Sequence, residues 1–239
     1  MQAMLLPDIS RLTGLRGLSL IRVAVAARGL AVSRSLSHLE RLTLNLGDAN
    51  QTLAGDHAEE LPFPLTLLSH LRTLHIRNAM SLQTLPADIG SALPQLRKLT
   101  LFRVGELREL PASVTALQSL TSLEVNLANK MVSLPHDIGA LSRLRELLLI
   151  HCTHLEHLPA SLTQLACLNE MLILRCSIRS LSPNFSWLAR LRSLHLSGCA
   201  QLQALPADLS EMKALQELIV EGCNQLTDVD WSVLPRSSS

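Results

Sequence analysis

Aromatic residues are scarce in this chain of 239 residues. Phenylalanine, tryptophan and tyrosine together make up 2% of the sequence, and tyrosine is absent. Since aromatic rings usually supply much of the volume of a globular core, another residue type has to fill the interior. Leucine does so, because it accounts for 56 residues, about 23% of the chain. A core built from one aliphatic residue at regular positions is typical of an internal repeat.

Charge and long apolar segments are also scarce. Charged residues make up 17% of the chain and the net charge is +1, which argues against the basic stripe that nucleic acid or an anionic membrane surface requires. No uncharged run reaches the roughly 18 apolar residues of a membrane span, and residues 1–10 have neither a cationic nor a long apolar segment. We therefore expect no transmembrane helix and no secretory signal.

The motif L-x-L recurs nine times, at steps of 24, 32, 25, 24, 24, 24, 23 and 24 residues. Its two apolar positions are Leu18/Leu20, Leu42/Leu44, Leu74/Ile76, Leu99/Leu101, Leu123/Val125, Leu147/Leu149, Met171/Ile173, Leu194/Leu196 and Leu218/Val220. This period is the leucine-rich-repeat signature. It predicts a single domain over residues 1–239, with about nine repeats of 23–25 residues. The long step predicts an eight-residue insertion within residues 45–60, in a polar surface loop.

The repeat unit reads LPxxIxxLxxLxxLxLxxCxxLxx and is clearest over residues 134–157. The L-x-L stretch predicts a short strand with inward leucines, and successive copies are expected to pair as a parallel sheet on the concave side. Ile138, Leu141 and Leu144, spaced by three, predict a 3-10 or short helical turn on the convex side. The expected fold class is α/β, a leucine-rich-repeat solenoid curved like a horseshoe.

Four of the five cysteines occupy one position of the unit, three residues after the second strand leucine: Cys152, Cys176, Cys199 and Cys223. A metal or redox cluster is the alternative reading, but spacings of 23 or 24 residues match no zinc motif. We predict a structural ladder of inward thiols that hydrogen-bond neighbouring backbone. Cys167 is expected to be a small core filler on the convex side. An odd number of cysteines favours free thiols in a reducing compartment.

Neither a metal site nor a catalytic site stands out. His151, His154 and His157 are spaced by three, but the repeat places them in an extended loop, so solvated histidines are the preferred interpretation over a metal site. The chain contains no G-x-S-x-G, P-loop, H-E-x-x-H or paired C-x-x-C motif. We expect no enzymatic activity and no cofactor from these residues.

The outward strand positions form the predicted binding face, because solenoids present this surface to partners. Leu148, Ile150, Leu172 and Leu174 lie on adjacent strands and predict an exposed apolar patch. The alternatives are loose alternation in a buried parallel sheet and cover by another segment of the same protein. The predicted partner-binding residues are Phe102, Glu124, Glu146, Leu148, Ile150, Glu170, Leu172, Leu174 and His195.

Charge on this face is expected to separate along the chain. Basic residues lie in the first half, at Arg41, Arg77, Lys98 and Arg103. Acidic residues lie in the second half, at Glu124, Glu146, Glu170, Glu217 and Glu221. Such polarity orients a partner more than it adds affinity. A further row, Arg16, Arg72, Arg97, Arg145 and Arg192, is predicted to line one rim of the sheet and to form salt bridges with loop acids.

The unit LPxxIGxLxxLxxLxLxxCxxLxxLP, over residues 110–159 and 205–223, resembles two groups of proteins. One is the leucine-rich-repeat type III effectors of plant-pathogenic bacteria, of the XopL and PopC kind. The other is the repeat region of plant nucleotide-binding resistance proteins. The chain has 18 arginines and 3 lysines, which favours the bacterial group; a fragment of a plant immune receptor is the alternative.

The effector resemblance implies a virulence protein secreted through type III secretion into the cytoplasm of a host cell, where it binds a host protein. It also implies delivery of that target to a ubiquitin-ligase domain, or to the E2 of such a domain, outside this chain, since no cysteine here stands in the cysteine-x-aspartate motif of repeat-linked ligases. Residues 6–9 begin within a repeat and residues 229–234 start another, so we expect sequence beyond both ends. The motif names no particular target.

Overall fold

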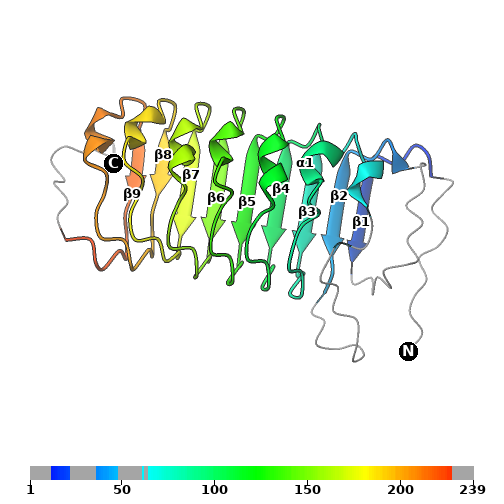
Figure 1. The fold of residues 1–239 in the computed structure, drawn as a ribbon, viewed down its shortest axis with the longest axis horizontal. Coiled ribbons are helices and arrows are strands. Elements are labelled where there is room, and N and C mark those ends of the chain that lie inside the picture. The colour runs from blue at the N-terminus through cyan, green and yellow to red at the C-terminus, as the bar shows by residue number, and fades with distance from the viewer. Residues whose placement is uncertain (1–11, 22–35, 48–60, 62–63, 228–239) are drawn as a thin grey trace.

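The computed structural model of the chain describes residues 12–21, 36–47, 61 and 64–227. Within these ranges nine strands form one parallel sheet, and their order in the sheet is their order in the chain (Figure 1). The strands are β1 (Gly17–Ile21), β2 (Arg41–Asn45), β3 (Thr73–Arg77), β4 (Lys98–Phe102), β5 (Ser122–Asn126), β6 (Glu146–Ile150), β7 (Glu170–Leu174), β8 (Ser193–His195) and β9 (Glu217–Ile219). Most of the insertion predicted within residues 45–60 lies outside the described residues.

The register of the sheet confirms the L-x-L alignment. Between β5 and β6, for example, Leu123 pairs with Leu147 and Val125 with Leu149. From β2 through β7 both inward side chains of every strand are fully buried. The last two strands are shorter than predicted, because β8 and β9 end one residue before Leu196 and Val220.

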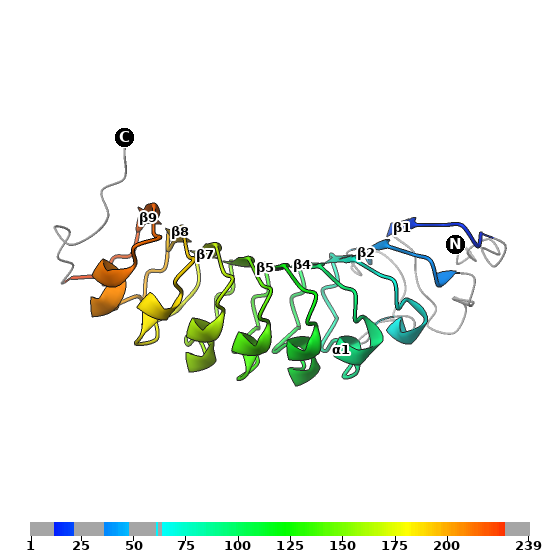
Figure 2. The same cartoon turned by 90° about the horizontal axis from the view of Figure 1, so that it is seen from above.

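Short helices line the opposite side of the molecule. They are η3 (Leu65–Leu67), α1 (Ile89–Ala92), η4 (Ala112–Ala116), η5 (Ile138–Ala140), η6 (Ala160–Gln164), η7 (Phe185–Trp187) and η8 (Ala207–Glu211), all 3-10 helices except α1. Figure 2 shows the strands on one side and the helices on the other, with both ends of the strand row bent away from the helices. The strand side is therefore concave, as predicted. None of the described helices has the length and apolar character that crossing a bilayer requires.

Each strand from β3 to β9 is followed within one to three residues by a residue with left-handed backbone. Its φ is +54° at His151, whose N–H donates to the Leu174 carbonyl of the next repeat at 2.8 Å. Glycine fills the position in β8's repeat, where a Cβ on Gly198 would lie 2.8 Å from Cγ of Arg175. The other members of this row are Asn78, Arg103, Leu127, Arg175 and Gly222. From β3 to β9 the turn thus repeats with the strands and directs the chain back toward the helices.

The core is a stack of aliphatic layers. Among the described residues Phe185 is the one fully buried aromatic side chain, and leucines fill most of the remaining interior. Each layer buries its leucines against the layers before and after it, so stability comes from stacking of repeats. This architecture is a leucine-rich-repeat solenoid.

Candidate functional site: the concave face of the sheet

The predicted binding residues gather on the central strands of the concave face. Seven lie on β5, β6 and β7, while Phe102 ends β4 and His195 ends β8. Register pairs Glu146 with Glu170, Leu148 with Leu172 and Ile150 with Leu174 across β6 and β7. The nine side chains are all half-buried: Phe102, Glu124, Glu146, Leu148, Ile150, Glu170, Leu172, Leu174 and His195.

The central apolar patch is less exposed than the sequence predicts. None of Leu148, Ile150, Leu172 and Leu174 belongs to the strongly exposed apolar residues, such as Val132 at 53%. The physical reason is that neighbouring strands of a sheet lie only about 4.8 Å apart, so side chains in one column cover each other's flanks. The patch is a continuous apolar surface of partly covered side chains.

Two carboxylates stand side by side at the start of this patch. Glu146 and Glu170 are register partners on β6 and β7, and neither forms an ion pair with a described residue. Like charges directly opposite each other are destabilising in a sheet. The basic residues Arg77 and Lys98 lie on β3 and β4, so the order of the strands keeps them apart from these acidic residues, as predicted. Within the part of the chain that the structure describes, the concave face therefore offers negative charge without an ion-pair partner beside an apolar surface.

Beyond the patch, His195 belongs to a polar cluster with Ser193 and Glu217. The Ser193 hydroxyl lies 3.0 Å from His195 Nε2 and 3.0 Å from Glu217 Oε2, and Glu217 Oε2 lies 3.1 Å from the same Nε2. A catalytic relay needs the serine and the carboxylate on different ring nitrogens, which this geometry does not provide. Hydrogen bonds from His195 and Ser193 hold the pKa of Glu217 below its usual value. The cluster therefore forms a polar border for the patch.

The first half of the face carries a histidine that the prediction did not include. Burial, Arg77 and Lys98 lower the pKa of His75. Its Nδ1 and the Oγ1 of its register partner Thr100 are buried without a hydrogen-bond partner among the described residues. The sequence could have indicated this histidine, because His75 stands between the two apolar positions of β3 and the cationic residues Arg77 and Lys98 lie on β3 and β4.

The cysteine ladder is confirmed. Each thiol points inward and contacts a backbone carbonyl of the preceding repeat, at distances of 3.7 Å for Cys152, 3.4 Å for Cys176, 3.2 Å for Cys199 and 2.9 Å for Cys223. Burial raises the pKa of Cys199 to about 12, and the neighbouring Cys152 thiol together with burial raises that of Cys176. Within the described ranges no three His, Cys, Asp or Glu side chains are arranged to hold a metal ion.

The prediction for Cys167 was wrong. Leu165 and Leu168 take the inward positions on either side of it, so Cys167 lies half-buried on the rim where the strands begin. Its Sγ accepts a hydrogen bond from Nη1 of Arg190 at 3.7 Å.

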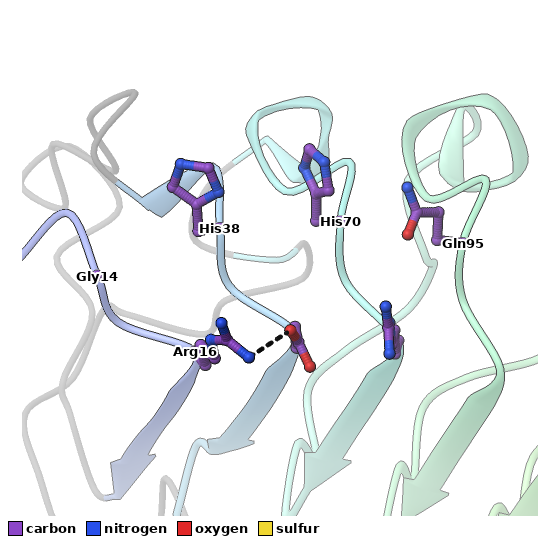
Figure 3. A pocket seen from close by; sticks show the side chains of 7 residues that line it. Gly14, Arg16, His38, His70 and Gln95 are labelled. Atoms are coloured by element: carbon purple, nitrogen blue, oxygen red, sulfur yellow. Dashed lines mark ion pairs between the residues drawn. The ribbon is translucent and has the colours of Figure 1, made fainter.

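The arginine row does line this rim, but its predicted salt bridges are mostly absent. Arg16 pairs with Glu40 at 3.6 Å, whereas the other four arginines form no ion pair with a described residue. The residues one repeat before and after each arginine are its neighbours on the rim. Thr121 and Asn169 are examples, and few residues at this position are acidic. Figure 3 shows the Arg16 end of the rim, where His38, His70 and Gln95 follow one another on successive turns around a shallow pocket.

The fold and this face together define a leucine-rich-repeat protein-interaction module. No protein-family model and no curated protein sequence matches the chain. Solved structures do: the leucine-rich repeat domain of the type III effector XopL is 26% identical with a TM-score of 0.64, over 74% of this chain and 70% of that one.

Two other solved structures match the chain at lower similarity. A leucine-rich repeat protein of Leptospira interrogans is 23% identical with a TM-score of 0.48, over 84% of this chain and 58% of that one. Internalin C2 of Listeria monocytogenes is 16% identical with a TM-score of 0.48, over 83% and 78%.

Proposed function

We propose that the concave face from β5 to β8 binds a host protein and that the chain is the target-binding part of a bacterial type III effector. The similarity to the XopL repeat domain supports the effector class. Arrival in the host cytoplasm by type III secretion follows from that class. Any transfer of ubiquitin to the bound target would be carried out by a ligase domain or its E2 outside this chain, for which the solenoid serves as the recognition element.

One observation carries the proposal of a binding face. Leu148 and Leu172 stand in register at the centre of the face. Glu146 and Glu170, which form no ion pair with a described residue, stand in register one position before Leu147 and Met171. Covering half-exposed aliphatic side chains releases part of the roughly 1.5–3 kcal/mol that full burial of each one provides. The complementary partner segment carries apolar side chains with lysine or arginine beside them.

The experiment compares aspartate substitutions on the two faces of the same strands. Leu148→Asp and Leu172→Asp are each expected to reduce partner capture at least tenfold, because an unpaired charge is then placed under the partner. Folding should change by only about 1 kcal/mol, since these side chains are already half in water. Capture from plant cell extract is measured by quantitative mass spectrometry alongside thermal melts.

Two controls make the result decisive. Val132→Asp changes a residue that is 53% exposed outside the concave strands, and should leave both capture and melting unchanged. Leu149→Asp buries the charge in the core and should unfold the protein. If Leu148→Asp melts like the wild type and captures the same partner equally well, the proposed face is wrong.

A further inference from the structure

The rim where the strands begin carries a second surface, at the start of β6, β7 and β8. Three arginines, Arg145, Arg190 and Arg192, surround an open pocket of about 470 Å³. The other lining residues are Cys167, Asn169, Ala189 and Ala214. We call this the arginine pocket.

The backbone of the arginine pocket is held rigidly. The Arg145 carbonyl accepts the N–H groups of Asn169 at 2.8 Å and Glu170 at 3.0 Å. The Arg192 carbonyl accepts two N–H groups from the next repeat in the same way, at 2.8 and 2.9 Å. Arg145, Asn169 and Arg192 therefore stand at fixed intervals of one repeat, and Arg190 is steadied by its contact with Cys167. The backbone of the pocket is thus fixed before binding, whereas the three arginine side chains are exposed and a ligand would order them.

The charge of the pocket is not neutralised within the described residues. No carboxylate lines it, and none of its three guanidinium groups forms a described ion pair. The pocket at the other end of the rim differs, because there Glu40 neutralises Arg16. The acids that follow on the concave side are Glu146, Glu170 and Glu217, and the last already contacts Ser193 and His195.

Three guanidinium groups and one amide suit a phosphate monoester better than a carboxylate. A phosphate monoester carries nearly two negative charges and three acceptor oxygens, and arginine forks bind such oxygens in pairs. A carboxylate offers one charge and is satisfied by a single arginine. The Asn169 side chain adds N–H donors at the same rim.

We propose that the arginine pocket binds a phosphorylated serine, threonine or tyrosine side chain of the protein held on the concave face. This proposal rests on the proposed function. The pocket lies at the start of the strands whose outward residues form the apolar patch, so an extended segment of about five residues spans both at about 3.3 Å per residue. Binding at the pocket would make recognition depend on the phosphorylation state of the partner.

The first test uses small probes and does not need the partner. Phenyl phosphate and benzoate are titrated at constant ionic strength, and the arginine Nε–H signals are followed by NMR. We expect saturable shifts with phenyl phosphate, at least tenfold weaker binding of benzoate, and at least a tenfold loss for the triple variant Arg145→Gln, Arg190→Gln, Arg192→Gln. The matched control Arg72→Gln, Arg97→Gln changes the same row outside the pocket and should bind phenyl phosphate normally.

Equal losses in the triple variant and in the control would overturn the proposal, because they would indicate only a general effect of positive charge. Inositol hexakisphosphate and a phosphoserine peptide are then compared. Binding of inositol hexakisphosphate a hundredfold tighter than that of the peptide would assign the pocket to a soluble polyphosphate and overturn the assignment to a protein partner.

The second test separates this proposal from the proposed function. Leu172→Asp should lose the partner and keep phenyl phosphate binding, whereas the triple arginine variant should lose only the phosphorylated partner, and phosphatase treatment should reproduce that loss with the wild type. If Leu172→Asp still captures the partner, the proposed binding on the concave face is wrong, while the phosphate-binding pocket is not affected. Capture that is indifferent to both phosphatase and the arginines counts against the phosphorylated side chain.

Discussion

The repeats of β3–β5 and those of β6–β9 share one framework and present different chemistry. The inward position after each left-handed turn residue is apolar in the first region, at Ala79, Val104 and Ala128, and cysteine in the second, at Cys152, Cys176, Cys199 and Cys223. On the concave face the first region carries Arg77 and Lys98, whereas the second carries Glu146 and Glu170 beside an aliphatic patch.

The framework of both regions depends on the same backbone interactions. In the first region the Arg103 N–H donates to the backbone carbonyl of Asn126 at 2.8 Å. In the second region the His151 N–H donates to the backbone carbonyl of Leu174 at 2.8 Å. The backbone ladder is thus the same with or without a thiol at the next position. Because a thiol is a weak donor, the cysteines supplement a structure that stacked leucines and backbone hydrogen bonds already determine.

The largest expected effect comes from the close helix packing that both regions share. A Cβ on Gly90 would overlap the Ser113 carbonyl, and one on Gly139 would overlap the Ser161 carbonyl. Because backbone cannot easily give way, we expect Gly90→Ala and Gly139→Ala each to lower the free energy of unfolding by about 1–3 kcal/mol. Urea unfolding followed by circular dichroism measures both values.

A matched control is Gly105→Ala, whose Cβ would meet Cε of Met80 at 2.7 Å. That atom is the end of a flexible side chain, so the cost should be much smaller. If Gly90→Ala costs far more than Gly139→Ala, the two regions do not share one framework.

Thiol reactivity gives an intermediate effect. In alkylation at pH 8 the half-buried Cys167 should react first and Cys223 next, because burial raises the pKa of Cys223. Cys176 and Cys199 should react most slowly, since the reactive thiolate is disfavoured at both. Mass spectrometry of the labelled peptides gives the order, and labelling in denaturant should abolish it.

The same labelling assay tests whether the equivalent position in the first region is equally closed to solvent. Ala128 is fully buried at the position that holds cysteine in the next repeat. The thiol introduced by Ala128→Cys should therefore be as protected as that of Cys176. Rapid labelling at this site, with the wild-type order unchanged, would show that the position is less closed in the first region.

The smallest expected effect is a difference in pH dependence. The pKa of His75 is lowered in the native state, so the unfolded chain binds the proton first and stability falls as the pH drops from about 6.5 toward the native pKa. The pKa of Glu217 is also lowered, and its contribution is present above the usual glutamate value of 4.5 and lost as the pH falls through the native pKa.

Substitutions of His75 and Glu217 test whether these two pH ranges belong to the two regions. His75→Gln should weaken the pH dependence of the melting temperature below pH 6.5, whereas Glu217→Gln should change it only below the usual glutamate value of 4.5. An unchanged profile in His75→Gln would mean that the histidine is protonated equally easily in the folded and unfolded chain.

The outward residues of the proposed binding face were placed correctly on their strands by the sequence, but their exposure was not predicted. The columns of Leu148 and Leu172, and of Glu146 and Glu170, follow from the repeat length, because register in a solenoid is set by counting residues. The partial burial of these side chains does not follow from the repeat length, because it depends on how closely adjacent side chains pack. The contact between Ser193, His195 and Glu217 likewise depends on rotamers that spacing leaves open.

The sequence by itself determined the solenoid, since a period of about 24 residues with leucines at fixed places allows one way of burying them. It also determined that Cys152 and its equivalents point inward. The sequence also placed Arg145 and Arg192 on one rim of the sheet, but only the tertiary structure decided their neighbours there: both line one open pocket with Arg190 and the half-buried Cys167, and neither forms an ion pair with a described residue. The physical reason is that inward positions obey a periodic rule of burial, whereas rim side chains are long and solvated, and their neighbours come from the stacking of repeats.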